Sequence, residues 1–355
     1  MTTPWIKKPD GYFRAVVWTV AGMLLSLVAL TEVIANGTDA APAAEQQQAP
    51  SDEKGEPKDP NTPKSPPAHR DNDPSDPNQP PANGLVENGN EEDDDSMFPD
   101  AEDMVELFDL FGRIFNDQYI TETGFVDYTT LRRKRADLIK ASNLLEKLHP
   151  AVLMSLNREQ RIAFWINTYN TCILKLIIDN YPIQPKWYMI LYPSNSIMQI
   201  PGATTKVFFR IMGLEYNLKE MRNDLLLDRY RDPRICFALT EAARGGAILR
   251  NEPYLPDTLE EQLDDQVHRF LNSPHGLRIN RQSNVLHLSN VFSMNKKVFL
   301  ESEYAEILRF RARKPEERAW LNFLSKYLPQ EDAQWLDAND PTIRFIDFDW
   351  NLNEK

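Results

Sequence analysis

The chain has 355 residues, a formal net charge of -13 and two cysteines, which are too few for a disulfide scaffold. The charge is uneven, because residues 37–100 carry -12 and residues 101–355 carry only -2. The C-terminal part therefore lacks the basic excess of a nucleic-acid-binding surface, and we expect no nucleic-acid partner.

An uncharged stretch of 17 residues lies near the N-terminus, at 15–31, and three basic residues precede it. We expect an uncleaved transmembrane anchor at 15–35, with residues 1–14 in the cytoplasm and the rest of the chain exported. A cleaved signal peptide and a buried soluble helix are the alternatives. The predicted location is a single-pass position in the membrane, with the globular domain in the periplasm if the source is Gram-negative.

Residues 36–100 differ in composition from everything that follows them. They hold 12 of the 26 prolines and a single aromatic residue, Phe98. Such a segment cannot bury enough apolar area to offset the entropy lost on ordering, so we expect a disordered linker that proline stiffens and charge extends. The acidic run at 91–95 could bind cations or basic partners, but a solvated spacer is the favoured interpretation.

The longest apolar run lies at 158–182, and its spacing predicts a helix that ends at Tyr181-Pro182. The helix has one predicted solvent-facing stripe, formed by Arg161, Thr168, Thr171, Lys175 and Asp179. Asn167 and Asn170 fall among its apolar residues, where an amide without partners costs roughly 1–3 kcal/mol. We expect these amides either to clamp neighbouring backbone, which is the favoured interpretation, or to line a polar pocket.

The remaining patterns predict helices interleaved with short hairpins, in an α+β domain over residues 101–355. The expected helices lie at 101–116, 131–148, 218–227, 258–271, 289–304 and 315–328. The expected hairpins lie at 206–218 and 278–288, and a final strand is expected at 343–348. Residues 187–202 are rich in aromatic residues and proline and predict a long surface loop.

A second polar cluster follows the buried run at 234–239, where Glu241 and Arg244 precede Gly245 and Gly246. Glycines let a backbone approach a ligand closely, and an arginine beside them could hold a carboxylate or phosphate. The favoured interpretation is a plain turn with a Glu241–Arg244 ion pair. The glycine spacing matches neither a dinucleotide fingerprint nor a phosphate loop.

Standard catalytic machinery is not apparent in the sequence. None of the five histidines has metal-ligand spacing to another histidine or cysteine, so we expect no metal and no cofactor. Cys172 and Cys236 lie in apolar runs without an activating histidine beside them, and we expect both thiols to be unpaired.

Seven ordered segments resemble the domain of unknown function 547 family, found in bacteria and plants. They are FVDYTTL, EQRIAFWINTYN, NYP, the hairpin exit at 214–221, DPRICFAL, LEEQLDDQVHRFLN and FIDFDWNLN. The resemblance covers about residues 101–355 and implies no established reaction.

Two departures from the family pattern concern the same region. Many bacterial members have histidine where this chain has Cys236, and Ser-Cys-Pro-Pro where it reads Gly-Gly-Ala-Ile at 245–248. If the family cysteine were a nucleophile, the resemblance implies that this chain has lost it. The retained residues include Trp165, Asn167, Asn170 and Arg234.

Two functions remain open. The favoured one is a non-catalytic, membrane-tethered module that binds a protein or envelope component through an exposed apolar patch around residues 187–192. The alternative is a hydrolase or transferase without a cysteine nucleophile, in which Arg244 holds an anion and Glu241 acts as base in an open cleft. The residues of a binding or structural pocket would be Trp165, Asn167, Asn170, Arg234, Gly245 and Gly246.

Overall fold

The computed structural model describes residues 101–355. Within that part of the chain, no helix is both long and apolar enough to span a membrane. The expectations for residues 1–14, 15–35 and 36–100 lie outside the described residues and stay predictions.

The described residues are rich in helix, with short sheets, which confirms the α+β class. The longer helices are α2 (Ala101–Ile114), α4 (Ala136–Lys147), α6 (Arg158–Asn180), α9 (Leu259–Leu271), α13 (Pro315–Tyr327) and α14 (Gln330–Asn339). The shorter helices are α3 (Tyr128–Arg133), α5 (Val152–Ser155), α7 (Leu218–Glu220), α8 (Asp228–Tyr230), α10 (Asn290–Met294), α11 (Lys296–Leu300) and α12 (Glu303–Glu306). A π-helix, η3 (Met221–Leu227), joins α7 to α8, and 3-10 turns form η2 (Ile197–Gln199), η4 (Pro233–Phe237) and η5 (Pro256–Thr258).

Both expected hairpins are confirmed. Strands β1 (Phe208–Ile211) and β2 (Leu214–Asn217) pair antiparallel, with Phe208 opposite Asn217. Strands β3 (Leu277–Asn280) and β4 (Val285–Ser289) also pair antiparallel, with Leu277 opposite Leu288. The final strand, β5 (Thr342–Ile346), adds to β4 in parallel and completes a three-stranded sheet in the order β3-β4-β5.

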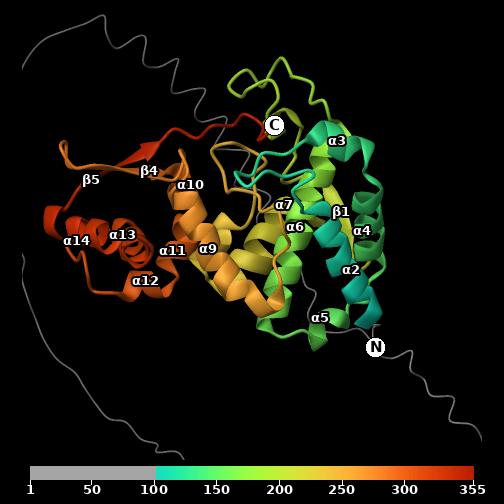
Figure 1. Cartoon of the computed structure of the whole chain (residues 1–355), viewed down its shortest axis with the longest axis horizontal. Coiled ribbons are helices and arrows are strands. Elements are labelled where there is room, and N and C mark those ends of the chain that lie inside the picture. Colours follow the sequence, from blue (N-terminus) through green and yellow to red (C-terminus); the bar gives the residue numbers. More distant parts are fainter. Residues whose placement is uncertain (1–100) are drawn as a thin grey trace, which may run out of the picture. The chain divides into compact units, whose positions relative to one another are not determined.

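Helix α6 is the centre of the domain. Its first turn is held by a capping box, because the Asn157 side chain accepts from Gln160 N at 2.8 Å while the Gln160 side chain accepts from Asn157 N. Helices α2, α3 and α4 lie on one side of α6. Helix α9 and the C-terminal helices lie on its other side (Figure 1). Because α6 is enclosed in this way, 16 of its 23 residues are buried.

The predicted solvent-facing stripe of α6 is therefore only partly correct. Arg161 and Lys175 are half-buried and Asp179 is exposed, but Thr168 and Thr171 are buried. Their hydroxyls have no hydrogen-bond partner among the described residues, so these threonines contribute mainly their methyl groups to the packing.

Two helix predictions are wrong because the chain interrupts a helix that was expected to be continuous, and a third, at 218–227, is confirmed as helix but not as regular α-helix. Residues 131–148 belong to two helices, α3 and α4, and residues 289–304 hold three short ones. Residues 218–227 change from α-helix to π-helix after the first turn. Helix α14 was not predicted, because only Leu336 of its ten residues is buried and its apolar periodicity is weak.

Aromatic rings fill the core between η4 and the C-terminal helices. The centroids of rings in contact lie 5.1–6.0 Å apart, and the residues are Phe237, Phe270, Phe292, Phe299 and Phe323. Aromatic pairs at these separations stabilise a core beyond the area that they bury. This aromatic cluster attaches η4 to α9, α10, α11 and α13. It thereby also positions the polar segment that follows residue 239.

Candidate functional site

The two asparagines of α6 clamp backbone from two other segments. Asn167 donates to Tyr254 O at 2.8 Å and accepts from Tyr254 N at 2.9 Å. Asn170 donates to Ala238 O at 2.9 Å and accepts from Thr240 N at 3.1 Å. Each side-chain amide bonds to a buried backbone N–H and a buried C=O group, as a neighbouring strand would in a β-sheet. The segment that leads into Glu241 is thereby fixed to α6.

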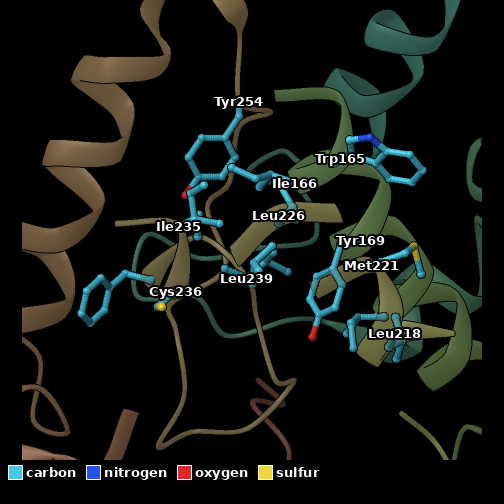
Figure 2. Packing of buried hydrophobic residues seen from close by; sticks show 14 of the residues in the cluster. Trp165, Ile166, Tyr169, Leu218, Met221, Leu226, Ile235, Cys236, Leu239 and Tyr254 are labelled. Carbon is cyan, nitrogen blue, oxygen red and sulfur yellow. The ribbon is translucent and has the colours of Figure 1, made fainter. Parts of the chain in front are cut away.

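Trp165 and Arg234 also lie in structural contacts. Trp165 is buried on the side of α6 away from Tyr254 (Figure 2), with its ring 5.7 Å from that of Tyr216. The Arg234 guanidinium donates to three carboxylates, those of Asp232, Asp264 and Glu260, at 2.6–3.1 Å. Burial lowers the pKa of this arginine, but these carboxylates outweigh burial and raise it. Arg234 is thus committed to holding η4 against α9.

Glu241 does not form the expected ion pair with Arg244. Its Oε1 accepts from Arg222 Nη1 at 3.0 Å, and its Oε2 accepts from Ala247 N at 2.9 Å. Arg222 also donates to Asn295 Oδ1 at 2.9 Å. Only 15% of the Arg222 side chain and 11% of the Glu241 side chain are exposed. Burial lowers the pKa of Arg222, but the Glu241 carboxylate raises it and the net shift is upward.

A cavity of about 300 Å3 opens beside this ion pair. Its polar wall contains Tyr169, Arg222, Glu241 and Asn295, and its apolar wall includes Ile173 and Trp350. Burial raises the pKa of Tyr169 to about 12, so its hydroxyl stays protonated at neutral pH. The Arg222–Glu241 pair was not predicted, because Arg222 lies 19 residues before Glu241 in a helix whose turns widen locally.

Arg244 faces a different cavity, of about 610 Å3, which Gly246, Arg269, His275 and Asp349 also line. Its guanidinium lies 5.6 Å from the centre of the Phe125 ring. The backbone around it pairs with the C-terminal segment, since Arg244 N donates to Asn351 O and Gly245 N donates to Asp349 O, both at 2.9 Å.

The two glycines are required by close approaches rather than by a ligand. A Cβ at position 245 would meet the backbone N of Asp349, and a Cβ at position 246 would meet the Glu241 carboxylate. The glycine pair therefore lets the C-terminal segment and the Glu241 side chain pack against this turn.

Both cysteines are free and buried, which confirms that they are unpaired. Figure 2 shows Cys236 among packed apolar side chains, beside Ile235. Burial raises the pKa of the Cys236 thiol to about 12 and also raises that of Cys172. Among residues 101–355, no group of three or more histidine, cysteine, aspartate or glutamate side chains could hold a metal ion.

Thiol labelling checks this burial. At neutral pH we expect neither cysteine of the folded chain to react with a maleimide, because both thiols are buried and burial raises the pKa of each, which leaves little reactive thiolate. Both should react once urea unfolds the chain, and mass spectrometry counts the adducts. Rapid labelling of the folded chain would show that the burial is incorrect.

A cluster of exposed apolar residues lies in the loop between α6 and β1. Trp187, Ile190 and Leu191 expose 87%, 83% and 89% of their surface, and Tyr188 is also exposed. The rings of Trp187 and Tyr188 are 5.6 Å apart in an edge-to-face contact. Scattered exposed apolar residues are normal, but four of them within five residues form a patch. We call residues 186–192 the loop tip.

One buried glutamine holds the loop tip in place. Gln199 is 2% exposed, and its amide nitrogen lies 3.1 Å from each of the carbonyl oxygens of Met189, Tyr192 and Pro193, which share its two N–H donors. Its side-chain oxygen accepts from Lys186 N at 2.7 Å. The clamp spans both ends of the loop tip and directs the backbone polar groups inward. The apolar side chains are then displayed on a fixed backbone.

Replacing Gln199 with alanine is expected to loosen the loop tip without unfolding the domain. The change removes the acceptor of Lys186 N and the donor for three carbonyls. Hydrogen exchange measured by mass spectrometry should speed up at the amides of residues 186–196, while the amides of α6 stay protected. Gln184→Ala is the control, because the exposed Gln184 donates to no described residue other than Pro182, whose carbonyl oxygen accepts. Equal exchange in the two variants would exclude the clamp.

The candidate residues of the sequence analysis do not converge on one site. Glu241 lines the smaller cavity, and Arg244 and Gly246 line the larger one. Asn167, Asn170 and Arg234 are engaged elsewhere. The residues that the sequence did not single out are Arg222, which pairs with Glu241, and Gln199, which shapes the loop tip.

Part of the described chain matches a known family model. Residues 153–271 match the family model described as "Protein of unknown function, DUF547". The matched segment runs through α6, the loop tip, η4 and α9. No curated protein and no solved structure matches the chain.

Proposed function

We propose that this chain, of which residues 153–271 match the domain of unknown function 547 (DUF547) family model, is a non-catalytic binding module tethered to a membrane. In this proposal residues 15–35 are the anchor, residues 36–100 are the linker and residues 101–355 are the exported domain. The loop tip is the contact element.

The clamped, exposed loop tip carries this proposal. Exposed apolar side chains are costly in water, and full burial of each against a partner contributes roughly 1.5–3 kcal/mol. Because Gln199 fixes the backbone beforehand, a partner does not have to order the loop on binding. A flexible apolar loop would lose much of that gain to conformational entropy.

The buried Arg222–Glu241 ion pair argues against a catalytic thiol in this chain. Where the family resemblance places a cysteine, this chain has Gly246, and a Cβ there would meet the Glu241 carboxylate. Glu241 is held in that place by Arg222 and Ala247 N. The space of the family thiol is therefore filled by a salt-bridged side chain.

The alternative of a hydrolase or transferase has less support. It requires Glu241 and Arg244 to act on one substrate, but these residues line different cavities. Both carboxylate oxygens of Glu241 also accept hydrogen bonds within the domain, one from Arg222 and one from Ala247 N.

Photocross-linking in native membranes tests the proposed module. A photoreactive benzoylphenylalanine replaces Leu191 in the full chain, and the same residue replaces Met154 as a control. Met154 is 83% exposed in α5, at the far end of the domain from the loop tip (Figure 1). We expect discrete protein or lipid adducts from position 191 that are absent from position 154. No adduct at position 191, or the same adducts at both positions, would contradict the proposal.

A further inference from the structure

The loop tip has the composition of a membrane-interface contact. Its sequence, Lys-Trp-Tyr-Met-Ile-Leu-Tyr, combines aliphatic residues with aromatic residues that have a polar edge. Trp and Tyr are enriched where a bilayer meets water, because their rings are apolar and their N–H and O–H groups remain hydrated. A lysine beside such residues can bury its methylene chain and keep its ammonium among the headgroups.

The chain segment that carries the loop tip is free of acidic residues, as is the segment at 266–300. Residues 182–214 contain no aspartate or glutamate, whereas residues 101–355 together carry -2. Three basic residues lie in this stretch, at Lys186, Lys206 and Arg210. Arg210 is 3.5 Å from Glu146 and 3.6 Å from Glu215, so its charge is compensated. The net positive charge of residues 182–214 therefore comes from Lys186 and Lys206.

We propose that the loop tip inserts into the interface of an anionic lipid bilayer. This inference rests on the proposed function and names its partner as lipid. The exposed Trp187, Ile190 and Leu191 enter the boundary between headgroups and acyl chains, and Lys186 pairs with anionic headgroups. These exposed side chains project from a clamped backbone. A fluid bilayer can accommodate them without a matching groove.

Because the proposed anchor and linker hold the domain at the membrane, even a weak insertion of the loop tip is enough to dock it. A single loop with four exposed apolar residues gives only shallow attachment by itself. An anchor at residues 15–35, followed by a 65-residue linker, would hold the loop tip near the same bilayer. Docking then becomes intramolecular, at an effective concentration of the order of millimolar or below. The domain would alternate between docked and free positions.

Fluorescence of the full chain reconstituted in vesicles tests the inference. Leu191→Cys is labelled with an NBD maleimide, while the buried Cys172 and Cys236 stay unlabelled; Met154→Cys is the control. The vesicles contain phosphatidylcholine alone or phosphatidylcholine mixed with phosphatidylglycerol. We expect blue-shifted emission, quenching by nitroxide lipids and shielding from iodide at position 191, most strongly with phosphatidylglycerol. Position 154 should stay accessible to iodide.

A charge variant tests the electrostatic part. Lys186→Gln in the Leu191→Cys chain should lower the ratio of docked to free domain about fivefold in the anionic vesicles and leave it unchanged in the neutral ones. Equal iodide access at positions 191 and 154 in both lipids would overturn the inference. If position 191 nevertheless cross-links to a protein in native membranes, the binding module stands and its partner is a protein. If neither contact is seen, both proposals fail.

Discussion

Replacing Asn170 with alanine is expected to lower the free energy of unfolding by about 2–5 kcal/mol, because it leaves two buried backbone groups without partners. These groups are the carbonyl of Ala238 and the N–H of Thr240, both of which bond to the Asn170 amide. The removed side-chain volume adds a cavity cost at a site that is 2% exposed. Urea unfolding followed by tryptophan fluorescence measures the change.

Two further variants separate hydrogen bonding from packing. Asn170→Asp keeps the shape but places a carboxylate oxygen against Ala238 O, so it should destabilise the fold at least as strongly. Asn180→Ala is the matched control, because within residues 101–355 the exposed Asn180 side chain bonds only to Leu176 O of its own helix. This change should alter stability by no more than about 0.5 kcal/mol. Similar small effects of Asn170→Ala and Asn180→Ala would refute the clamp.

Replacing Arg222 with methionine is expected to cost about 3–5 kcal/mol, because it leaves the Glu241 carboxylate buried without its counter-charge. Adding Glu241→Gln should recover part of that loss. Glutamine is neutral, and its carbonyl oxygen can still accept from Ala247 N. Denaturant unfolding of the single and double variants gives the coupling energy between the two positions.

The control for this pair is an ion pair on the surface. Arg281 bonds to Glu331 at 2.7 Å, but 46% and 79% of their side chains are exposed. Arg281→Met should therefore cost no more than about 1 kcal/mol. If Arg222→Met costs as little as this control, Arg222 and Glu241 do not form a buried pair in solution.

The sequence predicted the elements whose signals are local. Helix α6 has a continuous apolar run and a proline after its end, and both hairpins have a turn between short strands. The family resemblance is confirmed over residues 153–271, and its extension to the rest of residues 101–355 stays a prediction.

The candidate site was less predictable because its contacts join segments that are far apart in the chain. The Asn167 amide bonds to a residue 87 positions later, and Arg222 bonds to Asn295, 73 positions later. No periodic pattern records such pairings. Gln199 bonds within its own loop, but loops lack the periodicity that would single out one buried side chain.

The free energy of unfolding of Ile190→Ser/Leu191→Ser tests most directly whether the loop tip serves contact rather than folding. Both side chains are over four-fifths exposed, so they bury little area in the domain. We expect the double variant to differ from the parent by less than about 0.5 kcal/mol in urea unfolding. A loss of about 2 kcal/mol or more would show that these residues pack into the fold, and would contradict their assignment as a binding surface.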